Sequence, residues 1–150
     1  MSTLTTRVPA GIGIDPRGPR FAASLTSVVL VLVLLTPPPV ATVLLAFQAA
    51  VFAIGAFRGI QHTPYAALFK SAIRPRLTPP SELEDARPPR FAQAVGLGFA
   101  LVGLVALLAG ATVLGFVAVG LALVAALLNA VVGFCLGCEI YLLLRRATAR

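Results

Sequence analysis

The stretch "TVLGFVAVGLALVAALLNAVVGFCLGCEIYLLL", residues 112–144, decides the fold, because its 33 residues carry only one charge, on Glu139. A straight α-helix of that length would be about 50 Å long, whereas the hydrocarbon core of a bilayer is about 30 Å thick. The stretch is therefore a membrane span that either tilts and protrudes or breaks. Gly133 and Gly137 are the positions at which we expect a break.

Three further uncharged runs precede this stretch. They cover residues 21–36, 40–57 and 91–109, and the paired runs are joined by a triple proline at 37–39 and by GATVLG at 110–115. In the whole chain, 59% of the residues are hydrophobic and 11% are charged. Soluble domains are about 45–50% apolar and about 25% charged. We therefore predict an all-α membrane protein with four transmembrane helices in two hairpins.

The basic residues indicate how the chain is oriented. All twelve Lys and Arg residues lie outside the uncharged runs, and basic segments stay on the cytoplasmic side of a membrane. Both termini and the long middle loop are therefore expected in the cytoplasm, in a multi-pass protein of the plasma membrane. The predicted regions are a cytoplasmic N-terminal arm (1–20), transmembrane hairpin 1 (21–57), a cytoplasmic loop with an amphipathic helix (58–90), transmembrane hairpin 2 (91–144) and a basic cytoplasmic tail (145–150).

The middle loop contains one helical pattern, TPYAALFKSAI at 63–73. Thr63 can cap the N-terminus of a helix, and Pro64 suits its first position. The apolar residues after them recur at spacings of three and four, which places them on one helical face. We expect a short amphipathic helix that lies on the membrane surface.

A short repeat links the two predicted hairpins. RGPRFA at 17–22 and RPPRFA at 87–92 share the pattern R-x-P-R-F-A, 70 residues apart. Each copy stands at the entrance of a hairpin, which indicates two structural halves related by an axis along the membrane normal. The alternative is that basic, aromatic helix entrances recur by chance.

Residues 133–141, GFCLGCEIY, contain the only two cysteines, Cys135 and Cys138, and Glu139 follows directly. On a continuous helix these three residues share one face, and neighbouring Cβ atoms are about 5–6 Å apart. A disulfide needs Cβ atoms about 3.5–4.5 Å apart. A regular helix would therefore hold a dithiol, and oxidation would require a distortion at the neighbouring glycines.

Two interpretations of this group are open. In the first, the group is a reactive site, because an ionisable residue inside a span is by default a functional candidate. Cys138 would then be the attacking thiol, Cys135 would resolve, and Glu139 would move the proton that a thiol loses. In the second, the cysteines are small packing residues, and Glu139 pairs with an arginine at the membrane interface.

Arg58 and His62 follow the second span, and His62 is the only histidine. His62 could act as a base or a metal ligand, and either residue beside the dithiol would favour the reactive thiolate. Cys135, Cys138 and His62, together with Glu139, would form a metal-ligand set. His62 equally suits an ordinary polar position at the interface.

Two amides, Gln48 and Asn129, lie inside predicted spans. We expect them to form hydrogen bonds between helices rather than a transport path. No P-loop, HExxH, GxSxG or dinucleotide fingerprint occurs, so the sequence indicates no cofactor.

Several stretches together are similar to one protein family. They are GIDPRGPRFAA (13–23), HTPY (62–65), RPRLTPP-x-E-x-ED (74–85), PPRFAQ (88–93) and GFCLGCEIY (133–141). They resemble a family of small actinobacterial membrane proteins, the domain-of-unknown-function family 4395. The resemblance covers nearly the whole chain and implies four spans without an established activity. It also implies an association with thioredoxin-like or sulfur-transfer proteins, near which family members are often encoded.

The leading prediction is a membrane-embedded, cytoplasm-facing thiol site that exchanges electrons or sulfur with a soluble thioredoxin-like or rhodanese-like partner. The rival predictions are a thiol-based metal-binding or transport protein and a non-catalytic scaffold that docks partners through 58–90. The net charge of +7 suits the anionic surface of a lipid bilayer rather than nucleic acid. A bundle of this size is also compatible with a homo-oligomer.

Overall fold

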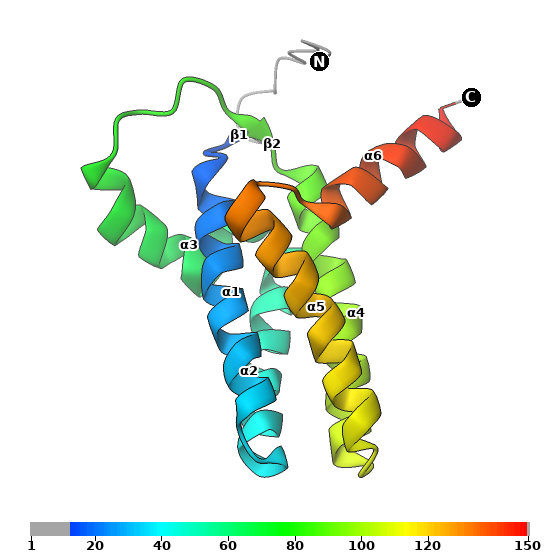
Figure 1. Ribbon diagram of the computed structural model, residues 1–150. Helices are drawn as coiled ribbons and strands as arrows, with labels where there is room; N and C mark the ends of the chain where they lie inside the picture. Colours follow the sequence, from blue (N-terminus) through cyan, green and yellow to red (C-terminus); the bar gives the residue numbers. More distant parts are fainter. Residues whose placement is uncertain (1–12, 150) are drawn as a thin grey trace.

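A computed structural model describes residues 13–149 and shows four long helices (Figure 1). They contain 19 to 22 residues each, and all four are long and apolar enough to cross a membrane. Helices of this length measure about 30 Å, which matches the hydrocarbon core. The fold is therefore that of an all-α membrane protein, as predicted. The long helices are α1 (Arg17–Leu35), α2 (Pro38–Phe57), α4 (Arg87–Leu108) and α5 (Thr112–Val132).

The helix that contains the first predicted span extends beyond it at the N-terminal end. α1 starts at Arg17, where the Asp15 carboxylate accepts the backbone N–H at 3.0 Å. Residues 1–12 of the predicted arm lie outside the described residues, as does Arg150 of the predicted tail. The shorter elements are β1 (Gly13–Ile14), the 3₁₀ turn η1 (Ile60–His62), α3 (Pro64–Leu68), the π-helical turn η2 (Phe69–Ile73), the 3₁₀ turn η3 (Arg74–Arg76), β2 (Glu84–Asp85) and α6 (Leu136–Thr148).

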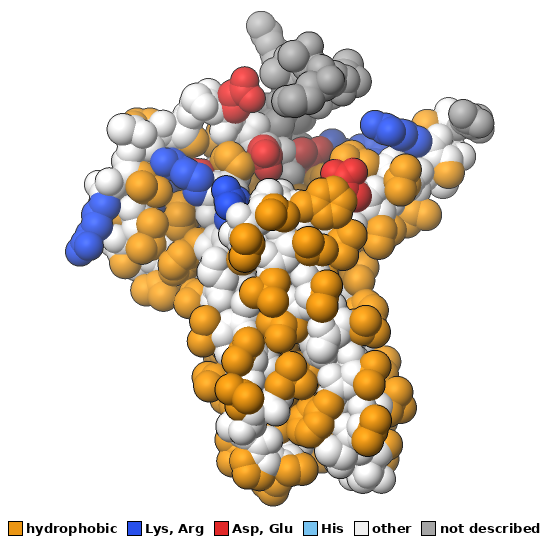
Figure 2. All heavy atoms as spheres, in the orientation of Figure 1, with side chains coloured by type: hydrophobic (Ala, Val, Ile, Leu, Met, Phe, Trp, Pro, Cys, Tyr) orange, Lys and Arg blue, Asp and Glu red, His pale blue; other side chains and the backbone are white. Residues whose placement is uncertain are grey.

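The four long helices enclose a small apolar core. α1 packs against α2 and α5, and α4 packs against the same two helices. Leu30, Leu45 and Val119 are almost completely buried between them. α4 and α5 approach closely through glycines, because a Cβ atom on Gly115 would lie 3.1 Å from the carbonyl oxygen of Gly103. Outside this core, large apolar side chains of all four helices are exposed (Figure 2), which suits lipid rather than water.

The charged side chains of the described residues gather at one end of the bundle (Figure 2). This end holds β1, β2, the middle loop and α6 (Figure 1), whereas the connections at 36–37 and 109–111 at the opposite end carry no charge. The distribution agrees with the clustering of Arg and Lys in the sequence. The compartment that the charged end faces stays a prediction.

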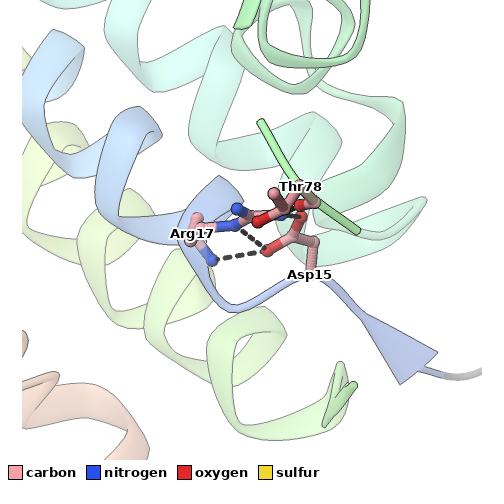
Figure 3. A network of polar contacts seen from close by, with 3 residues as sticks. All are labelled: Asp15, Arg17 and Thr78. Atoms are coloured by element: carbon pink, nitrogen blue, oxygen red, sulfur yellow. Dashed lines mark hydrogen bonds and ion pairs between the residues drawn. The ribbon is translucent and has the colours of Figure 1, made fainter. Parts of the chain in front are cut away.

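α1 and α4 each begin with an arginine paired to an aspartate two residues before it, and we call each such ion pair a clasp. Arg17 donates through Nε and Nη2 to the Asp15 carboxylate at 3.0 and 2.8 Å, and Thr78 accepts a further bond from Nη2 at 2.9 Å through its carbonyl oxygen (Figure 3). Arg87 donates through the same atoms to Asp85 at 3.0 and 2.6 Å. The two clasps are held together because β1 pairs with β2 in antiparallel register.

The second arginine of each repeat makes a matching contact as well. Arg20 in α1 donates to the carbonyl oxygens of Ala130 and Val131, in the last turn of α5, at 3.3 and 3.2 Å. Arg90 in α4 donates to the last two carbonyl groups of α2 at 2.7 Å each. Each arginine therefore ties its own half to the C-terminal end of a helix in the other half, where a positive charge is favourable.

An aromatic pair completes each half. Phe21 of α1 contacts Phe69 with ring centroids 5.8 Å apart, and Phe91 of α4 contacts Tyr141 of α6 at 5.6 Å. Clasp, arginine and aromatic pair thus recur together in both halves. Three matched sets of contacts support a true repeat over a chance recurrence of six residues.

The helix predicted over residues 63–73 of the middle loop is formed by α3 and the π-helical turn η2 that follows it. Thr63 caps it, since its Oγ1 accepts the N–H of Ala66 at 3.2 Å, and Pro64 takes the first position. Tyr65 and Phe69, from its apolar side, are buried. Part of that side therefore packs on the protein itself, and the location of α3 on a membrane surface stays a prediction.

We expect Asp15→Asn to lower the melting temperature in detergent more than Asp85→Asn, although both changes remove one carboxylate from equivalent clasps. The Asp15 side chain is 6% exposed and the Asp85 side chain 29% exposed, and water weakens the more exposed ion pair. Equal or reversed shifts would contradict this ranking.

The two clasps also predict that the fold becomes less stable at low pH. Hydrogen bonds from the Arg17 and Arg87 side chains hold the pKa of Asp15 and of Asp85 below the usual carboxyl value. The clasps therefore stabilise the fold fully above the ordinary pKa of about 3.9 and lose this effect as the pH falls through the lowered values. Melting curves measured at decreasing pH should show this loss in the wild type, and a smaller loss in each Asn variant.

Candidate functional site

The last apolar stretch breaks at a glycine. α5 ends at Val132, and Gly133 adopts a left-handed conformation with φ of +72°, which a residue without a Cβ atom adopts readily. The N–H groups of Gly133 and Phe134 donate to Asn129 and Leu128, both at 3.1 Å, and close the helix end. α6 begins three residues after Gly133 and runs away from the bundle (Figure 1). The predicted break at Gly133 is confirmed, and the continuous, protruding helix is excluded.

Cys135 and Cys138 form a disulfide at this break. Cys135 is the N-cap of α6 with extended backbone angles, and its Cα lies 5.2 Å from that of Cys138. The expectation that both cysteines and Glu139 share one face of a continuous helix is wrong, because the backbone of Cys135 is not helical. The two sulfur atoms can meet because α5 ends before Cys135 and α6 begins after it. The two cysteines therefore do not lie on one continuous helix.

Gly137 does not break the helix, contrary to the second predicted position. It lies in the first turn of α6, and this helix packs against α4. A Cβ atom on Gly137 would lie 2.5 Å from the Cβ and 2.6 Å from the Cα of Ala92. The glycine therefore allows close contact between α6 and α4, next to the disulfide.

A cavity of about 1170 Å³ lies beside the disulfide. α1, α4, α5 and the first turn of α6 supply most of its wall, together with the middle loop. Cys135, Cys138 and Glu139 all line it, with both cysteines partly buried and Glu139 exposed. Small molecules that enter this cavity can therefore reach the sulfur atoms.

Arg58 and His62 do not line the cavity. Arg58 is exposed at the end of α2, where its N–H donates to Ile54, and His62 is exposed in η1. Within residues 13–149, no group of three His, Cys, Asp or Glu side chains could hold a metal ion. The predicted ligand set of Cys135, Cys138 and His62 is therefore not assembled in this structure.

Arg20 is a basic residue of the cavity wall that was not among the site residues predicted from the sequence. A Cβ atom on Gly133 would lie 3.6 Å from the Arg20 Nε atom, and Gly133 is only two residues from Cys135. A positive charge near a thiol favours its thiolate form. The repeated R-x-P-R-F-A motif could have pointed to Arg20, because Arg20 and Arg90 occupy the same position in its two copies.

The two buried amides behave differently. Gln48 donates to the Thr26 hydroxyl at 3.3 Å and accepts from the Tyr65 hydroxyl at 2.7 Å, which confirms its predicted role between helices. Burial raises the pKa of Tyr65 to about 12, so its hydroxyl stays protonated and donates. Asn129 lines the cavity and forms no side-chain hydrogen bond with another residue of 13–149. Its predicted interhelical bond is not formed.

The Gly137 contact can be tested with Gly137→Ala. The new methyl group has no room against Ala92, and overpacking of this kind costs about 1–3 kcal/mol. We expect a lower melting temperature and faster reduction of the disulfide by a membrane-impermeant phosphine, because α6 must move away from α4. Gly120→Ala is the matched control, since nothing lies within 4 Å of a Cβ atom there. Wild-type behaviour of the Gly137 variant would contradict the contact.

No curated protein and no solved structure matches the chain. Residues 14–146 match the family described as Domain of unknown function (DUF4395). The match includes both repeat motifs, the helix break and the disulfide. The chain therefore belongs to the DUF4395 family.

Proposed function

We propose that this protein is a membrane thiol–disulfide exchange protein that works through Cys135 and Cys138. The observation that carries the proposal is a disulfide at the N-terminus of α6 in the wall of a large cavity. The two cysteines are also the only ones in the chain. The partner is a soluble thioredoxin-like or rhodanese-like protein, which meets the disulfide at the charged end of the bundle.

The proposal includes an orientation. The two helix pairs 21–57 and 91–144 cross the plasma membrane as hairpins, with α3 on the cytoplasmic surface. The charged end, the middle loop and both termini then face the cytoplasm, because basic segments stay on that side. The reactive pair would lie near the cytoplasmic interface, within reach of a soluble partner.

The helix break favours Cys135 as the attacking thiol, in place of Cys138 in the sequence prediction. The Cys135 sulfur accepts the N–H of Cys138 at 3.2 Å. In the reduced protein this N–H and the positive end of the α6 dipole would stabilise a thiolate at Cys135. Arg20, near Gly133, would add to this effect. Glu139 follows Cys138 directly and would accept the proton that the second thiol loses.

The exchange reaction then has two steps. The Cys135 thiolate attacks a sulfur of the partner disulfide, forms a mixed disulfide and releases one partner thiolate. The Cys138 thiolate next attacks the Cys135 sulfur, which restores the internal disulfide and releases the second partner thiolate. Two electrons thereby pass from this protein to its partner, and the same steps in reverse oxidise the partner.

The same pair could transfer sulfur. The Cys135 thiolate would attack the outer sulfur of a partner persulfide, become a persulfide itself and release the partner thiolate. Cys138 would then attack the Cys135 sulfur, form the disulfide and release hydrosulfide. Both routes begin with the same thiolate, so one experiment tests their common step.

Single-cysteine variants test the assigned roles. In lipid nanodiscs, Cys135 in a Cys138→Ser protein should react with iodoacetamide at lower pH than Cys138 does in a Cys135→Ser protein. Cys138→Ser should also accumulate a mixed disulfide with the partner, because the resolving thiol is absent. If neither cysteine reacts and no mixed disulfide forms, the proposed function fails.

The variant Arg20→Gln tests whether the charge of Arg20 favours the thiolate of Cys135, and Arg90→Gln serves as its control. We expect Arg20→Gln to slow alkylation of Cys135 about three- to tenfold near neutral pH, since a neighbouring cation favours the thiolate. Arg90→Gln breaks the equivalent helix-end contact but removes no residue from the cavity wall. Equal slowing in both variants would mean that Arg20 acts only on the fold.

A further inference from the structure

A second hollow begins where the disulfide cavity ends. It has a volume of about 410 Å³, lies between α4 and α5, and is lined entirely by apolar residues and glycine. Val95, Phe99 and Leu121 line both hollows. The wall of the second hollow faces outward, since Val102 and Leu114 are more than half exposed. The two hollows together extend from the disulfide to the lipid-facing surface.

Three amide side chains lie in the wall of the disulfide cavity. Gln93 and Asn129 line the cavity and form no side-chain hydrogen bond with another residue of 13–149. Gln61, also in the wall, has a buried Oε1 atom without a hydrogen-bond partner among the described residues. A buried amide oxygen without a partner, such as Gln61 Oε1, is costly in apolar surroundings. Gln93 and Asn129 are partly exposed, and their amide N–H groups are free to donate to a ligand with polar atoms.

We propose that the two hollows bind a lipid-soluble quinone, with its ring beside the Cys135–Cys138 disulfide and its isoprenoid tail in the apolar hollow. A quinone has two carbonyl oxygens that can accept bonds from the N–H groups of Gln93 and Asn129, and a long apolar tail. Gln61 Oε1 is an acceptor and would instead accept from a hydroxyl group of the hydroquinone product. An apolar site with a few placed polar groups is typical of binding sites for such ligands. This inference rests on the proposed thiol function and names the membrane partner of the same site.

The quinone would remove the electrons that the soluble partner delivers. The Cys135 thiolate forms a bond to a ring carbon, and the Cys138 thiolate then attacks the Cys135 sulfur. The S–S bond forms, the C–S bond breaks, and its electron pair stays on the ring. Two protons from the two thiols complete the hydroquinone. The dithiol is oxidised by two electrons and the quinone is reduced by two.

The first experiment uses the full chain in nanodiscs, reduced and then freed of reductant under anaerobic conditions. Two probes share one ring: dimethylnaphthoquinone without a tail, and a menaquinone with an isoprenoid tail. Free thiols are counted by maleimide labelling after each addition. We expect the tailed quinone to restore the disulfide at least about tenfold faster at equal membrane concentration, since tail burial favours binding.

The second experiment fills the apolar hollow. Gly98 lines this hollow and has nothing within 4 Å of a Cβ atom, so Gly98→Leu adds bulk without a clash. We expect it to remove the advantage of the tailed quinone. Gly120→Leu is the matched control, because Gly120 has the same free space but lines neither hollow. Oxidation by the tail-less quinone should stay unchanged in both variants.

The outcomes separate this inference from the proposed function. A water-soluble thiol oxidant, diamide, tests the cysteine pair without a quinone. If diamide restores the disulfide and the tailed quinone does not, the quinone inference is overturned and the thiol function stands. If the hollow holds only a phospholipid acyl chain, the tailed quinone shows no advantage in the wild type, which also overturns it. If no oxidant restores the disulfide, the proposed function itself fails.

Discussion

The thickness of the bilayer core is the constraint on which the rest of the structure depends. The apolar residues 112–144 are too many for one upright span of about 30 Å, and the chain leaves α5 after Val132 rather than continuing as a tilted helix. Gly133 ends α5 by adopting a conformation that other residues adopt only with strain. A new helix must then begin, and its N-cap is Cys135. The site exists because a length limit places a helix N-terminus directly at the cysteine pair.

The repeat shows how one half of the molecule acquired a feature that the other lacks. Both halves keep an aspartate clasp, an arginine on the opposite helix end and an aromatic pair. Both also start a short outer helix with a side-chain cap. In the first half the cap is the Thr63 oxygen, and in the second it is the Cys135 sulfur, each accepting an N–H at 3.2 Å. A framework of two similar halves therefore carries one cysteine pair.

Much of this fold could be predicted from the sequence, because lipid imposes long uncharged runs that are easy to recognise. The length of residues 112–144 allowed a break, and glycine marked Gly133 and Gly137 as its two candidate positions, of which only Gly133 ends a helix. The disulfide could not be predicted, because the expected spacing of the cysteines assumed that Cys135 is helical, and Cys135 lies outside the helix. The clasp strands, β1 and β2, contain two residues each and leave no periodic signal. The position of Arg20 near the site could not be predicted either. It depends on a contact between residues 110 positions apart in the sequence, which a local sequence pattern does not show.

The cysteine count has a kinetic consequence. With two cysteines in the chain, one subunit can store a single electron pair and has no second dithiol to which it could pass that pair. As the proposed redox protein, it would therefore complete its reaction with one partner before the next could begin. Donor and acceptor would alternate on the same two sulfur atoms, one from the water side and one from the membrane. Steady-state rates would then give parallel lines in a double-reciprocal plot, the pattern of a substituted-enzyme mechanism.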